Sequence, residues 1–258
     1  MRPNLTEKPV PKPFIAPSRA AMGRRAAEEI AEEMRRRLQA QPSVRMIFAA
    51  APSQSEMLAE LIAMPGIDWS RVTAFHMDEY LGLAENAPQR FALWLRKAIF
   101  DRVPFARVEL LEPGGDPEAT AAAYAEKLAA APIDLVCCGI GANGHLAFND
   151  PPADLNDPKD VKVVELDVAC RQQQVDDRCF DRFEDVPTHA LTLTVPRLLA
   201  SDRIFCCVPG DLKKTAVRRT LQDPISGAVP ATALRTHTNW SLYLDQDSAA
   251  ELNRTEGR

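Results

Sequence analysis

The chain has 258 residues, of which 46% are hydrophobic, 26% are charged and only 6% are aromatic. This length and composition exclude a largely disordered chain and predict a sizeable aliphatic core of the kind found in many α/β enzymes. The 31 Lys and Arg residues fall short of the 36 Asp and Glu residues, which argues against a broad nucleic-acid-binding surface and requires any anionic partner to be held by a few local groups.

The first 17 residues contain five prolines and predict an extended N-terminal arm, 1–17. The arm lacks the uninterrupted apolar core of a signal peptide, and no apolar run in the chain approaches the roughly 20 residues that span a bilayer. We therefore expect a cytoplasmic protein that does not bind membranes. Residues 18–245 predict a single domain, and 246–258 are polar enough to predict a C-terminal tail.

The first predicted element is a helix capped by Ser18, whose core-facing stripe recurs every four residues, at positions 22, 26, 30, 34 and 38. Short apolar runs then predict strands at 45–50, 71–75, 107–111, 133–138, 203–208 and 240–245. Helical stretches lie between them, at 55–64, 89–100, 117–131 and 211–221. This alternation predicts an α/β fold, a single Rossmann-like domain with a mostly parallel central sheet and helices on both faces.

The segment 151–200 interrupts the alternation of strands and helices. Its runs VKVVEL and HALTLTV predict a small inserted antiparallel pair or a lid, with 151–185 as the lid segment.

The cysteines favour buried, reduced thiols. Cys137 and Cys138, and likewise Cys206 and Cys207, are adjacent inside apolar runs, where neighbouring side chains point to opposite faces of a sheet. The sequence contains no C-x-x-C motif and only four histidines. It therefore predicts neither disulfides nor a metal site.

The first candidate site follows the strand predicted at 45–50. Ser53, Gln54 and Ser55 stand at a strand-to-helix turn, where two hydroxyls and the unpaired N–H groups of a helix start can cradle an anion. A plain helix cap by Ser53 or Ser55 explains the same residues almost equally well.

Two carboxylates, Asp78 and Glu79, follow the strand predicted at 71–75. On an extended backbone they face opposite ways, so at most one of them points into a site at the strand ends. An acid desolvated there has a raised pKa and can act as a proton shuttle. The alternative is an Asp that caps the next helix beside a solvated Glu.

The segment GIGANG at 139–144 matches the dinucleotide-binding pattern G-x-G-x-x-G. A dinucleotide loop opens a helix, whereas here two prolines stop any helix within about two turns. We therefore interpret Gly141 and Gly144 as parts of a tight loop that contacts a ligand. The loop presents three polar side chains, those of Asn143, His145 and Asp150. A histidine and an acid in one strand-end loop favour a functional role over a structural turn.

Lys213 or Lys214 begins the helix predicted at 211–221, where a cation opposes the helix dipole. A bound anion would remove that conflict. Arg171 and Arg178 lie in a polar segment and are alternative clamps for the same anion.

Four segments of the chain resemble the glucosamine-6-phosphate deaminase (isomerase) family, in the superfamily that also holds 6-phosphogluconolactonase. They are FHMDEYLGL at 75–83, GIGANGHLAFNDP at 139–151, VPTHALTLTVPRLL at 186–199 and VPGDLKK at 208–214.

The resemblance implies roles for individual residues. Asp78 corresponds to the base that moves a proton between C1 and C2 of the sugar, and His145, supported by Asp150, to the group that opens the pyranose ring. The phosphate ligands of the family fall on Ser53 to Ser55, on Arg171 or Arg178, and on Lys213. We also expect Asn143 to belong to the catalytic group and Glu79 to contact the substrate. The chemistry requires no metal, Lys Schiff base or redox cofactor.

The implied activity is aldose-ketose isomerisation with deamination of an amino-sugar 6-phosphate, in which glucosamine-6-phosphate and water give fructose-6-phosphate and ammonia. One alternative is a 6-phosphogluconolactonase-like hydrolase, in which His145 activates water against an ester. Another is a non-catalytic regulator that binds sugar phosphates. The expected partner is a small sugar phosphate and not a nucleic acid, and a homo-oligomer is left open.

Overall fold

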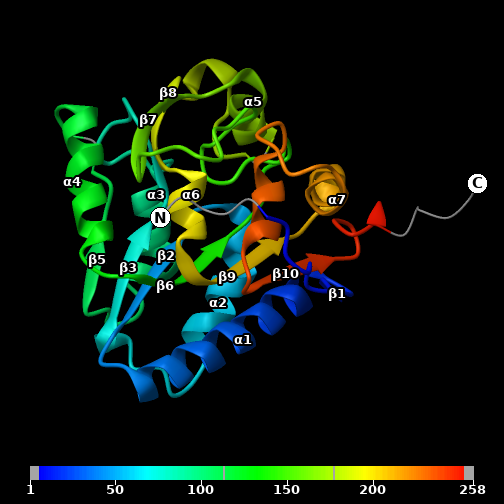
Figure 1. Ribbon diagram of the computed structural model, residues 1–258. Helices are drawn as coiled ribbons and strands as arrows, with labels where there is room; N and C mark the ends of the chain where they lie inside the picture. Colours follow the sequence, from blue (N-terminus) through cyan, green and yellow to red (C-terminus); the bar gives the residue numbers. More distant parts are fainter. Residues whose placement is uncertain (1–5, 113, 177, 253–258) are drawn as a thin grey trace, which may run out of the picture.

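The computed structural model describes residues 6–112, 114–176 and 178–252. Within these residues the central sheet consists of β1 (Phe14–Ala16), β2 (Val44–Phe48), β3 (Val72–His76), β5 (Arg107–Glu109), β6 (Ile133–Cys138), β9 (Ser201–Val208) and β10 (Trp240–Asp245). The strands pair in the order β1-β10-β9-β6-β2-β3-β5, and every pairing is parallel (Figure 1). The predicted α/β fold with a mostly parallel sheet is confirmed.

Helices cover both faces of this sheet. They are α1 (Arg19–Ala40), α2 (Ser55–Ala63), α3 (Phe91–Leu95), α4 (Pro117–Ala129), α5 (Val168–Asp176), α6 (Val195–Leu199) and α7 (Lys214–Gln222). Helices α1 and α2 lie on one side of the sheet, and α4, α6 and α7 lie on the other (Figure 1). Each face therefore has its own apolar cluster, as expected when both sides of a parallel sheet are buried.

The adjacent cysteines show how the strands divide their side chains between the two faces. Cys137 and Cys207 belong to the cluster beneath α1, whereas Cys138 and Cys206 belong to the opposite cluster. None of the cysteines, all of which lie within the described residues, forms a disulfide. The alternation of side chains along a strand explains why each pair is split.

Helix α1 forms where the four-residue stripe predicted it. The Ser18 hydroxyl accepts a hydrogen bond from the Ala21 N–H at 3.2 Å, and the apolar residues at 22, 26, 30 and 34 are completely buried. The cap satisfies one of the N–H groups that every helix start leaves unpaired, and the stripe supplies the packing.

The folded unit extends beyond the predicted limits of 18–245. Residues 14–16 of the predicted arm form β1, which pairs with the edge strand β10 and covers its backbone groups. In the predicted tail, residues 246–252 form turns, and Ser248 and Ala249 are buried. The remaining parts of the predicted arm and tail at 1–5 and 253–258 lie outside the described residues.

A second, antiparallel sheet is built from β4 (Asp78–Tyr80), β8 (His189–Leu193) and β7 (Val161–Glu165), in that order. The pair β7 and β8 is the predicted insertion. Strand β4 was not predicted, and it brings Asp78 opposite Thr192 of β8. The role of 151–185 as a lid remains a prediction. Among the described residues, no helix is both long and apolar enough to cross a membrane.

Candidate active site

The loops that follow β3, β2, β6 and β9 surround a cavity of about 390 Å³. These four strands are consecutive neighbours in the sheet, so their carboxyl ends meet at one edge. After β2 the chain adds β3 and β5 on one side of the sheet, and after β6 it adds β9 and β10 on the other side. Such a reversal of strand order between β2 and β6 is a switch point, where α/β folds bind ligands. Five of the predicted site residues line the cavity: Ser53, Asp78, Gly141, His145 and Lys213.

Asp78 is the carboxylate that faces this cavity. Its side chain lies at the start of β4, and the residue is only 6% exposed. Burial, and to a lesser extent the like charge of Glu79, raises the pKa of Asp78 well above its ordinary value. A carboxylate with a raised pKa is a stronger base, which suits proton transfer to and from a ligand.

Glu79 points the other way, in agreement with an extended backbone at this position. Its carboxylate is completely buried and accepts hydrogen bonds from the N–H groups of Tyr80, Phe91 and Ala92 at 2.9, 3.1 and 3.0 Å. Glu79 therefore anchors the start of α3, in contrast to the predicted contact with a ligand.

The two glycines predicted to contact a ligand, both in the loop after β6, have a packing role. A Cβ atom at Gly141 would lie 2.3 Å from Nε2 of His145, so only glycine leaves room for the imidazole. Gly144 has a φ of +89°, and a Cβ there would lie 2.7 Å from Cγ1 of Val229. Gly144 does not line the cavity, unlike Gly141. Residues 139–148 contain no helix, as expected of a loop unrelated to dinucleotide binding.

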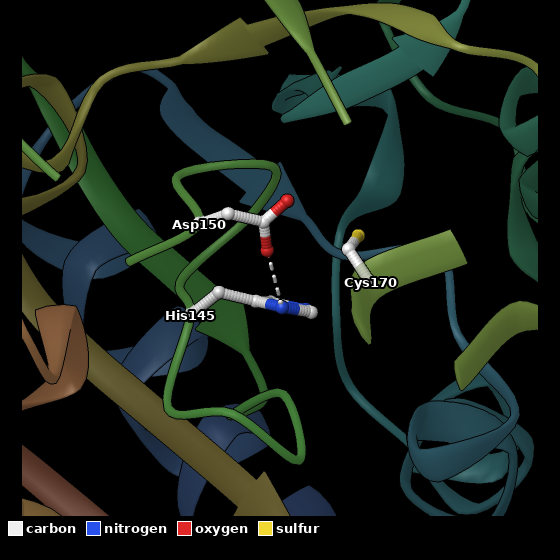
Figure 2. A group of neighbouring side chains, drawn as sticks. All are labelled: His145, Asp150 and Cys170. Atoms are coloured by element: carbon white, nitrogen blue, oxygen red, sulfur yellow. Dashed lines mark ion pairs between the residues drawn. The ribbon is translucent and has the colours of Figure 1, made fainter. Parts of the chain in front are cut away.

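The buried His145 and the half-buried Asp150 form a pair (Figure 2). Nδ1 of His145 lies 3.1 Å from Oδ1 of Asp150. Burial raises the pKa of Asp150, but its interactions with His145 and with the Asn143 amide outweigh burial and leave that pKa below its ordinary value. This arrangement leaves Nε2 of His145 as the ring nitrogen available to a ligand.

Asn143 braces this pair from outside the cavity. Its Nδ2 group donates to Oδ1 of Asp150 at 3.1 Å, and its Oδ1 accepts from the His145 N–H at 3.0 Å. Neither Asn143 nor Asp150 lines the cavity. Both contact His145, so Asp150 lies where the predicted support of His145 requires it, whereas Asn143 has no direct access to the cavity.

Of the three residues predicted to bind an anion after β2, only Ser53 has a place in the cavity wall. Ser53 lines the cavity, whereas Gln54 is completely buried behind it and donates to Ser53 Oγ and to the Cys207 carbonyl, both at 3.1 Å. Ser55 is exposed and does not line the cavity. Lys213 reaches the cavity from the turn after β9 and is only 7% exposed, so its charge is partly desolvated. Of the residues predicted to hold an anion, Ser53 and Lys213 thus line the cavity.

The two predicted arginine clamps differ in position. Arg171 donates hydrogen bonds to the carbonyl groups of Phe183 and Val186 at 3.0 and 2.9 Å, and it does not line the cavity. Arg178 is exposed and lines an adjoining pocket of about 260 Å³, which shares residues 50–52 with the main cavity. The geometry therefore favours Arg178 over Arg171.

The cavity wall includes residues that the sequence did not indicate, and two of them are polar groups with defined partners. Arg19, the first residue of α1, lines the cavity and is paired with Glu56 at 2.9 Å. The signal used for Lys213, a cation at a helix start, was present at Arg19 as well. Gln173 of α5 accepts a hydrogen bond from the Ala142 N–H at 2.7 Å. No local pattern marks Gln173, because its position depends on how α5 packs.

The strand ends of this parallel sheet hold a buried carboxylate, a His-Asp pair and a lysine around one cavity. Such a fold and site define a class of acid-base enzyme that acts on a small ligand. The sequence model of the family described as "Glucosamine-6-phosphate isomerases/6-phosphogluconolactonase" matches residues 17–242, and the chain belongs to this family. The predicted resemblance is confirmed.

Individual relatives of the chain, found by sequence and by structure, are members of the same family. Glucosamine-6-phosphate deaminases of Bacillus thuringiensis and Bacillus cereus are 36% identical to this chain over 185 residues, which cover 70% of this chain and 68% of each relative. A solved monomeric glucosamine-6-phosphate deaminase superposes with a TM-score of 0.85 at 25% identity, covering 93% of this chain and 99% of its own. A 6-phosphogluconolactonase from Shewanella baltica, at 20% identity and a TM-score of 0.77, covers 93% of this chain and 100% of its own and shares the fold.

Proposed function

We propose that this chain converts an amino-sugar 6-phosphate into a ketose phosphate and ammonia, with glucosamine-6-phosphate and water giving fructose-6-phosphate. One observation carries the proposal: the cavity joins a buried carboxylate, Asp78, to the imidazole of His145. The reaction needs both, a base at C2 and a group that exchanges a proton with the ring oxygen. Family membership and 36% identity to glucosamine-6-phosphate deaminases support this substrate.

The proposed reaction begins with ring opening. His145 takes the proton of the C1 hydroxyl group and returns a proton to the ring oxygen, which produces the open-chain aldehyde. Asp150, 3.1 Å from Nδ1, stabilises the imidazolium while it carries that proton.

Asp78 then performs the isomerisation. Its carboxylate removes the proton from C2 while the aldehyde oxygen takes up a proton from solvent, which forms an enol, and Asp78 then gives its proton to C1, which leaves an iminium ion at C2. Water adds to the iminium carbon, ammonia departs and a proton returns to solvent, so the product is the ketose phosphate. The burial that raises the pKa of Asp78 makes it effective both as base and, once protonated, as acid.

We propose that the phosphate binds at the opposite end, between Ser53 and Lys213. The Ser53 hydroxyl is held by Gln54, and the partly desolvated charge of Lys213 attracts an anion more strongly than a solvated lysine would. Arg19 at the cavity wall and the exposed Arg178 supply further positive charge. We place the reaction in the cytoplasm, which fits cysteines that form no disulfide.

The experiment compares ammonia release from glucosamine-6-phosphate and galactosamine-6-phosphate with hydrolysis of 6-phosphogluconolactone. We expect the wild type to release ammonia and Asp78→Asn to be slower by about 10²–10⁴-fold. Asp101→Asn is the matched control, because Asp101 is an exposed carboxylate in a surface ion pair. Lactone hydrolysis without ammonia release, or sugar-phosphate binding without turnover, would overturn the proposal in favour of a lactonase or a regulator.

A further inference from the structure

The described residues contain a cluster of three potential metal ligands beside the cavity. The ligand atoms are a ring nitrogen of His145, a carboxylate oxygen of Asp150 and Sγ of Cys170, and all lie within 4.8 Å of one another (Figure 2). Cys170 belongs to α5 and is completely buried. The sequence showed no Cys/His cluster because Cys170 lies 25 positions beyond His145 and only folding brings it close.

The geometry suits a tetrahedral ion. Zinc binds sulfur at about 2.3 Å and nitrogen or oxygen at about 2.0–2.2 Å, so two ligands of one ion lie no more than about 4.5 Å apart. His145 and Asp150, at 3.1 Å, already meet this limit. A cluster that spans at most 4.8 Å needs only a small side-chain rotation to bring the Cys170 sulfur within reach.

We propose that His145, Asp150 and Cys170 form a binding site for a thiophilic divalent cation, represented by Zn²⁺, with water in the fourth position. Imidazole, carboxylate and thiolate are all zinc ligands, and a sulfur ligand selects against Mg²⁺ and Ca²⁺. On binding, the Cys170 thiol gives its proton to solvent, so that thiolate and carboxylate together balance the two charges of the ion.

The surroundings of the cluster are negative, which suits a cation. Asp167 accepts a hydrogen bond from the Cys170 N–H, and its own N–H donates to Asp150 Oδ2 at 3.4 Å.

A bound ion would occupy Nδ1 of His145 and separate that nitrogen from Asp150. The imidazole could then no longer share a proton with Asp150, so the ion would inhibit ring opening. This consequence for activity rests on the proposed function, whereas binding of the ion does not.

The binding test uses Co²⁺ as a spectroscopic probe of the full-length protein. We expect one tetrahedral Co²⁺ per chain with a thiolate-to-cobalt charge-transfer band, and displacement of Co²⁺ by Zn²⁺. Cys170→Ser and Cys170→Ala should each lose the band and bind Zn²⁺ at least about 10-fold more weakly in equilibrium dialysis. The matched control is Cys179→Ser, which alters the half-buried cysteine outside the cluster and should keep the band.

Absence of the band in the wild type, or its persistence in both folded Cys170 variants, would overturn the proposal. Circular dichroism checks that each variant is folded. Inhibition of activity is tested separately. The Zn²⁺ concentration that halves the rate of ammonia release should be at least about 10-fold lower for the wild type than for Cys170→Ser. If the band is present but the wild type releases no ammonia, the proposed function fails while the metal site stands.

Discussion

The substitution Asp78→Asn should make the protein more stable while it removes the activity. Asp78 is 6% exposed, and burial together with the charge of Glu79 raises its pKa well above the ordinary value. A group whose pKa is raised by folding binds more protons in the folded state than in the unfolded state. Below the ordinary Asp pKa of about 3.9 the carboxyl group is protonated in both states and does not change the stability. As the pH rises from there towards the folded-state pKa, the group increasingly destabilises the fold.

The size of the effect follows from linkage. Each pKa unit by which folding raises the pKa of Asp78 costs about 1.4 kcal/mol at a pH above both values. For a chain of this length, about 1 kcal/mol moves Tm by about 2–4 °C. An asparagine has nearly the same shape as the aspartate and carries no charge. We therefore expect Asp78→Asn to raise Tm by at least about 3 °C at pH 8, with the difference shrinking towards zero near pH 4.

The assay is thermal unfolding of the wild type and Asp78→Asn between pH 4 and pH 8, followed by circular dichroism. Asp101→Asn controls for loss of one negative charge at an exposed site, and its Tm should change by less than about 2 °C. A lower Tm for Asp78→Asn at pH 8, or a difference between the two proteins that does not grow with pH, would refute the reasoning.

Four further substitutions test individual contacts. Gly141→Ala forces the His145 imidazole aside, because the new Cβ would lie 2.3 Å from Nε2, and should lower kcat for ammonia release by about 10²-fold without unfolding the protein; an unchanged kcat would contradict the packing argument. Lys213→Ala should raise KM for glucosamine-6-phosphate by about 10–100-fold but leave KM for unphosphorylated glucosamine unchanged, and equal effects on both would remove Lys213 from the phosphate site. Arg171→Ala should lower Tm without raising KM, because it loses two carbonyl hydrogen bonds, whereas Arg178→Ala should raise KM at constant Tm; the reverse pattern would restore Arg171 as the phosphate clamp.

The order of helices and strands could be predicted because each element carries its own local pattern. The stripe of α1 and the apolar runs of β2, β6 and β9 reflect burial that repeats with the period of a helix or a strand. The short strands β1 and β4 were not predicted, since neither lies in a longer apolar run of the kind that marked the equally short strand β5. They exist because β10 offers an open edge and because β8 pairs with the segment that carries Asp78.

The sequence by itself determined which loops form the site, because the polar residues that follow apolar strands must lie at the carboxyl edge of a parallel sheet. Only the tertiary structure decided which side chains enter the cavity. Asp78 faces it while Glu79 anchors α3, and Arg171 is held by two carbonyl groups while Arg19 reaches the wall from a distant helix. The direction of a side chain depends on strand pairing and on partners far away in the chain, and Cys170 lies beside Asp150 for the same reason.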